Sequence, residues 1–139
     1  MINRRELCSA LPFLALASSW AADDQVLSST TFPFEDLPQK KAEGHTTRPV
    51  VNGKFSTGEH VEVHETMLAP GAMPHAPHKH AHSEFWLIRE GNVELTINGQ
   101  GHRLGPGGVA LATGNDLHGI KNVGDTPAQY FVVAIGQMS

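Results

Sequence analysis

The sequence predicts a single all-β domain, a sandwich or small barrel of antiparallel strands. The 139-residue chain contains 14 glycines and 9 prolines, which indicates many turns. From residue 48 onward, short apolar runs alternate with turn signals at the spacing typical of antiparallel strands. No segment of about ten residues or more has the periodicity of an amphipathic helix. No internal repeat or second domain is visible.

An irregular polar arm is predicted at residues 23–47, with room for one short strand, and the other strands follow it in the sequence. The region 48–139 should form the barrel itself. Alternating or β-branched apolar runs predict its strands at residues 48–56, 59–69, 84–90, 93–97, 101–104, 108–113, 117–123 and 128–136. Asn98 and Gly99 are typical of a tight hairpin turn, because both central positions of that turn need a positive φ.

The first 22 residues are predicted to be an export signal. Arg4 and Arg5 precede an apolar run at 9–20, and the small residues Ala21 and Ala22 follow it. The run is too short for a permanent membrane anchor, which needs about 20 apolar residues. We therefore expect a periplasmic or secreted protein. The arginine pair resembles a twin-arginine signal, while the general secretion route and an N-terminal helix packed on the domain stay open.

Charge and cysteine content exclude several classes of protein. The net charge is −4 and there is no basic run, which argues against a nucleic-acid partner. The only cysteine, Cys8, lies inside the predicted signal. A chain cleaved near Ala22 would have no disulfide, thiolate nucleophile or thiolate metal ligand. Chemistry in the mature chain would therefore depend on nitrogen and oxygen groups.

Residues 75–84, HAPHKHAHSE, hold four of the nine histidines. Because alternate residues of a strand share a face, His78, His80 and Glu84 can point to one side. Two imidazoles and a carboxylate inside a barrel are a set of metal ligands, and their burial without partners would be costly. His118, on a later strand after a turn, could supply a third imidazole.

Two short motifs make the sequence resemble the cupin family. The first motif matches residues Gly71, His78, His80, Glu84 and Gly91, and the second matches Gly107, His118 and Asn122. Thr113 and Asn115 replace the proline and glycine of the second family pattern. Asn115 tolerates the left-handed conformation of a turn glycine, so the turn should persist. The resemblance covers residues 61–135 and implies a cupin β-barrel, the jelly roll or double-stranded β-helix.

The resemblance also implies the metal ligands His78, His80, Glu84 and His118. One divalent transition metal is then expected; Mn or Fe(II) is favoured, and Ni, Zn or Cu is possible with this nitrogen and oxygen set. His82 has the same parity and could be a fifth ligand, a loop histidine or a partner that orients a ligand. We favour the last role, because ligands need partners that fix their orientation.

Cupins with this ligand set include dioxygenases, isomerases and lyases, so the resemblance implies a metal-dependent enzyme acting on a small molecule. A non-catalytic metal- or small-molecule-binding accessory protein is the alternative, since a fold does not fix function. Glu84 is a candidate general base. Association as a homodimer is a further expectation.

The pocket wall is predicted from strand parity. Trp86 and Ile88 share the parity of Glu84 and should line the pocket, with Met73 and Phe55 nearby, although all four could simply fill the core. Lys79 and Arg89 have the opposite parity, which favours a small neutral or aromatic ligand. His75 is interpreted as a rim residue. The other four histidines are interpreted as residues on the polar faces of strands: His45, His60, His64 and His102.

Overall fold

The computed structural model describes residues 25–137, so the predicted export signal, Met1 to Ala22, lies outside them and stays a prediction. Within the described residues, no helix has the length and hydropathy needed to cross a membrane. The elements in chain order are η1 (Phe34–Asp36), β1 (Lys40–Ala42), β2 (His45–Lys54), β3 (His60–Leu68), β4 (Ser83–Glu90), β5 (Val93–Ile97), β6 (Gln100–Leu104), β7 (Val109–Ala112), β8 (His118–Asn122) and β9 (Ala128–Ile135).

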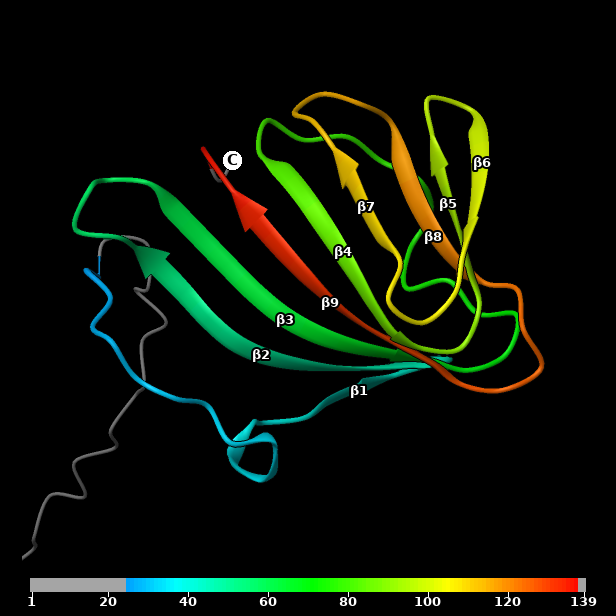
Figure 1. Cartoon of the computed structure of the whole chain (residues 1–139), viewed down its shortest axis with the longest axis horizontal. Coiled ribbons are helices and arrows are strands. Elements are labelled where there is room, and N and C mark those ends of the chain that lie inside the picture. Colours follow the sequence, from blue (N-terminus) through cyan, green and yellow to red (C-terminus); the bar gives the residue numbers. More distant parts are fainter. Residues whose placement is uncertain (1–24, 138–139) are drawn as a thin grey trace, which may run out of the picture.

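The strands form two antiparallel sheets with the core between them. The larger sheet has the order β1-β2-β3-β9-β4-β7, and the smaller sheet has the order β6-β5-β8. Side chains of β4 and β9 pack against side chains of β5 and β8 in one buried cluster. Figure 1 shows the smaller sheet beside β4 and β7, while β1, β2 and β3 extend beyond it. The predicted all-β jelly roll is confirmed.

Turn chemistry follows the sequence closely. Asn98 and Gly99 have φ values of 47° and 82°, and they join β5 to β6 as the predicted hairpin. Asn115 has a φ of 68°, so asparagine does supply the left-handed turn position ahead of β8. Strand β2, however, begins at His45, inside the range predicted as an arm. Residues 45–47 are polar, so no apolar alternation marked them as a strand.

The loop between β3 and β4 is fixed against the start of β8. The backbone groups of His78 and His118 exchange two hydrogen bonds, of 3.0 and 2.9 Å, and Asn115 N donates to His80 O at 2.7 Å. A side chain at Gly114 would collide with the carbonyl oxygen of Ala81. Glycine there lets the histidine-bearing loop approach the turn that carries His118.

Asn122, the last residue of β8, holds the other end of this loop. Its buried side chain donates to Leu68 O at 3.0 Å and to Thr126 O at 2.8 Å, and it accepts from Gly124 N at 2.9 Å. We expect Asn122→Ala to lower the free energy of unfolding by about 2–4 kcal/mol, because three backbone groups lose their partner, among them the buried carbonyl of Leu68. Urea unfolding measures this. The exposed Gln100→Ala is the control, and equal losses in both variants would contradict the assignment.

Candidate metal centre

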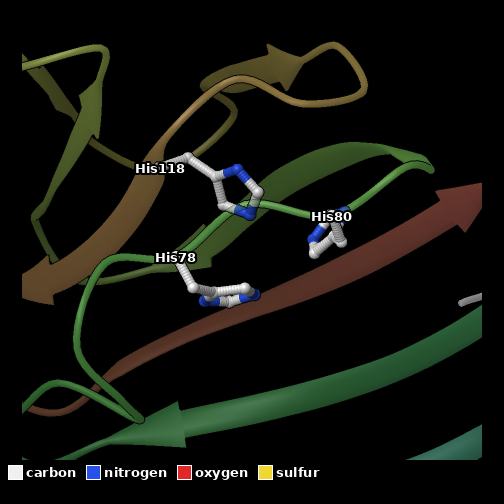
Figure 2. Close-up of side chains that lie close together, drawn as sticks. All are labelled: His78, His80 and His118. Atoms are coloured by element: carbon white, nitrogen blue, oxygen red, sulfur yellow. The ribbon is translucent and has the colours of Figure 1, made fainter.

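Three imidazoles from two distant parts of the chain meet inside the barrel. His78 and His80 come from the loop before β4, and His118 is the first residue of β8. Figure 2 shows the three side chains close together, with the two loop residues on one side and His118 on the other. One ring nitrogen of each lies within 4.8 Å of the other two. The chain positions that meet are those predicted from the two motifs.

Backbone carbonyls orient two of these rings. His80 Nδ1 lies 3.0 Å from His82 O, and His118 Nδ1 lies 2.9 Å from Asp116 O. A carbonyl oxygen only accepts, so both Nδ1 atoms carry the proton and both Nε2 atoms carry a lone pair. Those Nε2 atoms are buried and have no hydrogen-bond partner. An orienting bond on one nitrogen and a free, buried lone pair on the other are typical of a metal-binding histidine.

Glu84, at the start of β4, brings a carboxylate to the same point. Its Oε2 lies 3.4 Å from His118 Nε2, and its Oε1 lies 3.3 Å from His80 Nε2. Two ligand atoms that are each about 2.1 Å from one ion are roughly 3.0–3.4 Å apart at octahedral to tetrahedral angles. The spacing of Glu84 from His80 and from His118 therefore fits shared coordination of a divalent transition metal by nitrogen and oxygen donors.

His82 lies beside the carboxylate of Glu84 and the ring of His80. Its Nε2 is 3.2 Å from Glu84 Oε1, and its ring stacks on the ring of His80 with centroids 3.5 Å apart. His80, His82 and Glu84 form a second group whose atoms could share an ion. The stacking and the contact with Glu84 suit a residue that orients two neighbouring ligands.

His78 is the most accessible of the three clustered histidines, and His75 Nδ1 lies 3.0 Å from its Nδ1. Burial lowers the pKa of His78 below its usual value, and the neighbouring imidazoles of His75 and His118 lower it further. His78 is therefore largely neutral at pH 7, which is the form that binds a metal.

A cavity of about 300 Å³ opens beside the cluster. Trp86 lines it, with its ring 5.2 Å from the ring of His118. Ile88 has the same parity as Trp86 but lies one step deeper on β4, where it is buried in the core cluster and does not line the cavity. Met73 and Phe55 are exposed and lie outside the lining as well.

Several lining residues were not predicted. The predictions placed His45 and His64 on polar faces, yet both line the cavity, together with Thr47, Thr66 and Tyr130. The polar face of β3 is the inner one: Thr66 is buried, whereas Met67 is exposed. Strand alternation alone could not reveal this, because β2 and β3 extend past the smaller sheet, so their inner face borders a cavity instead of an apolar core.

Tyr130, the only tyrosine of the chain, lies on β9 in the cavity wall. Its pKa is raised far above the usual value, mainly by burial and further by the charge of Glu84, while a hydrogen bond with Thr66 acts in the opposite direction. The phenol is therefore neutral and keeps its O–H as a donor. We expect Tyr130→Phe to keep full metal content and to weaken binding of an oxygen-bearing ligand roughly tenfold. Metal analysis and ligand titration check both parts, and lost metal would contradict the expectation.

A two-sheet jelly roll that encloses clustered imidazoles and a carboxylate defines a cupin with a candidate metal site. The family model described as Cupin_2, Cupin domain, matches residues 64–134, which is half of the chain, and the protein belongs to this family. The match spans β3 to β9 and includes all four candidate ligands.

Known proteins are similar to this chain in part. L-ectoine synthases of Bordetella parapertussis and Bordetella bronchiseptica are 36% identical over 56 residues, which are 40% of this chain and 43% of theirs. The chain thus matches less than half the length of these relatives. The structure of KdgF from Halomonas sp. superposes with a TM-score of 0.69 at 18% identity, over 81% of this chain and 97% of that one. The structure of the polyketide cyclase RemF from Streptomyces resistomycificus superposes with a TM-score of 0.63 at 17% identity, over 79% of this chain and 81% of that one. These structural likenesses show the fold.

Proposed function

We propose that this cupin is a metal-dependent enzyme that acts on a small neutral or aromatic molecule in a dioxygenase-, isomerase- or lyase-like reaction. His78, His80, Glu84 and His118 would hold one divalent ion. The observation that carries the proposal is the pair of buried, unpartnered Nε2 atoms of His80 and His118, which meet Glu84 at the wall of a cavity. Buried nitrogens without partners are costly unless something binds them.

The chain's own residues would bind and orient the substrate. A metal bound there would supply a Lewis acid with open positions for substrate oxygen atoms. Trp86 offers an aromatic wall, and the neutral Tyr130 offers a hydrogen-bond donor. The residues that line this cavity include no lysine or arginine, which supports a neutral ligand. Glu84 could also accept a proton from a substrate that lies within hydrogen-bond reach.

The metal is proposed to be Mn or Fe(II), because the donor set is rich in nitrogen and oxygen and lacks sulfur. Metal analysis of the protein purified from its own host compartment tests both the site and the ion. We expect about one metal per chain, and a metal-free protein that takes up no Mn or Fe(II) when offered would contradict the proposal.

A metal- or small-molecule-binding accessory protein without turnover is the second candidate. The open cavity favours the enzyme, as do the names of similar proteins, a synthase and a cyclase. A panel of small neutral and aromatic molecules, incubated with metal-loaded and metal-stripped protein, separates the two. Turnover by the loaded form alone supports the enzyme, whereas ligand binding without turnover supports the accessory role.

Export to the periplasm or out of the cell is proposed as well, by the twin-arginine or the general secretion route, and the arginine pair separates the two routes. If the route is twin-arginine, replacement of both Arg4 and Arg5 by lysine should retain the protein in the cytoplasm, because that route requires the arginine pair. Cell fractionation with an immunoblot measures this, and Lys121→Arg on exposed β8 surface is the control. Normal export of the double variant would point to general secretion instead.

Self-association is also a proposal. Register places Leu87 opposite Val109, and Phe85 opposite Leu111, on the outer face of β4 and β7. Leu87, Val109 and Leu111 are exposed there. Exposed apolar patches of this kind are typical of interaction surfaces. Light scattering of the purified protein shows whether a dimer forms.

A further inference from the structure

A second, larger cavity of about 610 Å³ borders the metal cavity, and Thr47 and His64 line both. We propose that the two cavities form one binding site for an amphipathic ligand, and that His64, held by Glu62, accepts a proton from the polar head of that ligand. The proposal deepens the proposed function and rests on it, because the head would lie at the candidate metal centre.

His64 has the hydrogen-bond arrangement of a proton acceptor. Its Nδ1 lies 2.9 and 3.1 Å from the two oxygens of Glu62, which is two residues away on the same face of β3. A carboxylate only accepts, so Nδ1 carries the proton and Nε2 carries the lone pair. Among the described residues, Nε2 of His64 has no hydrogen-bond partner. A carboxylate that fixes the tautomer of an imidazole and stabilises its charged form is the usual arrangement of a general base.

Sheet register places His64 across from the wall of the metal cavity. His64 pairs with Val132 on β9, and Val132 pairs with Trp86 on β4. The three residues thus form one row on the inner face, and His64 and Trp86 are about 10 Å apart, twice the strand spacing. Valine between them is small, which leaves room for a ligand. His64 comes from a different strand than any candidate metal ligand, so its imidazole is not needed for the metal.

The larger cavity supplies the apolar half of the site. Phe32, Leu37, Pro49, Val50 and Val51 contribute to its lining. An irregularity of β2 between Pro49 and Val51 breaks the alternation, and both neighbours of the bulge line the cavity. The ligand class that fits is a neutral molecule with an apolar body and a head that carries a weakly acidic O–H.

The proton transfer is balanced within this arrangement. An O–H of the ligand head breaks, its proton moves to Nε2 of His64, and the ligand oxygen keeps the electron pair and its negative charge. The imidazolium that forms donates its Nδ1 proton to Glu62 as before. Other titratable side chains face this space, namely Asp36 and Lys40 in the larger cavity and His45 and His75 in the smaller one.

The test uses hydroxamic acids, which bind metals through two oxygens and lose one proton when they do so. Full-length protein loaded with Co(II) is titrated calorimetrically with acetohydroxamate and octanohydroxamate in two buffers of different ionisation enthalpy. We expect octanohydroxamate to bind at least about tenfold more tightly, because its longer chain fills the apolar cavity. In the wild type, His64 should retain the proton, so close to zero protons reach the buffer.

Three variants separate the parts of the proposal. His64→Gln should release about one proton per ligand to the buffer and weaken both hydroxamates roughly tenfold or more, with unchanged cobalt content. Glu62→Gln keeps the imidazole and should weaken binding less. Val50→Asp should remove the advantage of the long chain and leave acetohydroxamate binding intact. The exposed His102→Gln, on β6, is the matched control and should match the wild type.

The results also distinguish failure of this inference from failure of the proposed function. If His64→Gln binds cobalt and both hydroxamates like the wild type, with the same proton release, the inference is overturned while the metal site stands. Equal affinity of the wild type for the two hydroxamates overturns the shared cavity. If the wild type takes up no cobalt, the proposed function fails, and this inference fails with it.

Discussion

Replacement of His118 by alanine is expected to abolish metal binding and, with it, any turnover. The side chain of His118 is only 2% exposed, and its Nε2 lies 3.4 Å from Glu84 Oε2. The variant would keep the three candidate ligands on the loop and β4 but would lose the ligand that β8 supplies. Loss of a partner that merely orients a ligand costs roughly 10–100-fold in metal affinity, so loss of a ligand should cost more.

The fold should survive this change. His118 keeps its backbone hydrogen bonds with His78 whatever its side chain, so β8 and the loop stay joined. The small cavity left behind should lower the free energy of unfolding of the metal-free protein by about 1–3 kcal/mol. Circular dichroism checks the fold, and elemental analysis after metal loading and desalting checks the ion.

His102→Ala is the matched control, because it removes an exposed imidazole from β6 without touching the cluster. It should retain about one metal per chain. A His118→Ala variant that binds metal as tightly as the control would show that the ion, if any, lies elsewhere, for example in the second group formed by His80, His82 and Glu84.

Much of the barrel could be predicted because its strands carry local signals. The apolar alternation of β4 and β5, the Asn98-Gly99 turn and the histidine spacing are each readable within a few residues. The meeting of His118 with His78 and His80 joins positions far apart in the chain, and spacing alone did not predict it. It followed from the two motifs taken together and the barrel that they imply.

The cavity wall was harder to predict, for a physical reason. A strand has two faces, and alternation tells which residues share a face but not which face is inside. In β3 the apolar Val63 and Met67 suggested an inner face, whereas the structure turns His64 and Thr66 inward. The offset between the two sheets decides this, and it depends on strands that are distant in sequence.

Residues on the same face of a strand can border either the cavity or the core, and strand alternation does not predict which. Trp86 and Ile88 point the same way, yet only Trp86 reaches the cavity. Tyr130 pairs with Ile88 on one side and with Thr66 on the other, and it lines the cavity together with Thr66, whereas Ile88 does not. Such differences depend on side-chain volumes in neighbouring strands.

Acidification is expected to remove the stabilisation that the metal provides. At pH 7.5 and a free metal concentration about 1,000 times Kd, binding should stabilise the fold by about 4 kcal/mol. For a chain of this size that raises the midpoint of thermal unfolding by roughly 14 °C. As the pH falls, protons compete with the ion for the imidazole nitrogens, so the difference between loaded and stripped protein should shrink toward zero.

The metal-free protein should also become less stable as the pH falls, so its stability changes with pH in the same direction as that of the loaded protein. Burial holds the folded pKa of His78 below 6.5, its unfolded value, so below that pH the unfolded chain binds more protons than the folded one. The penalty is absent above 6.5 and grows as the pH falls toward the folded pKa. Scanning calorimetry between pH 5 and 8 measures how the unfolding midpoint of the metal-loaded and of the metal-stripped protein changes with pH. The midpoint of the loaded form should fall more steeply as the pH falls. His118→Ala, with or without metal, should follow the curve of the stripped form in shape. Parallel curves for loaded and stripped wild type would mean that the ion is not bound by imidazoles.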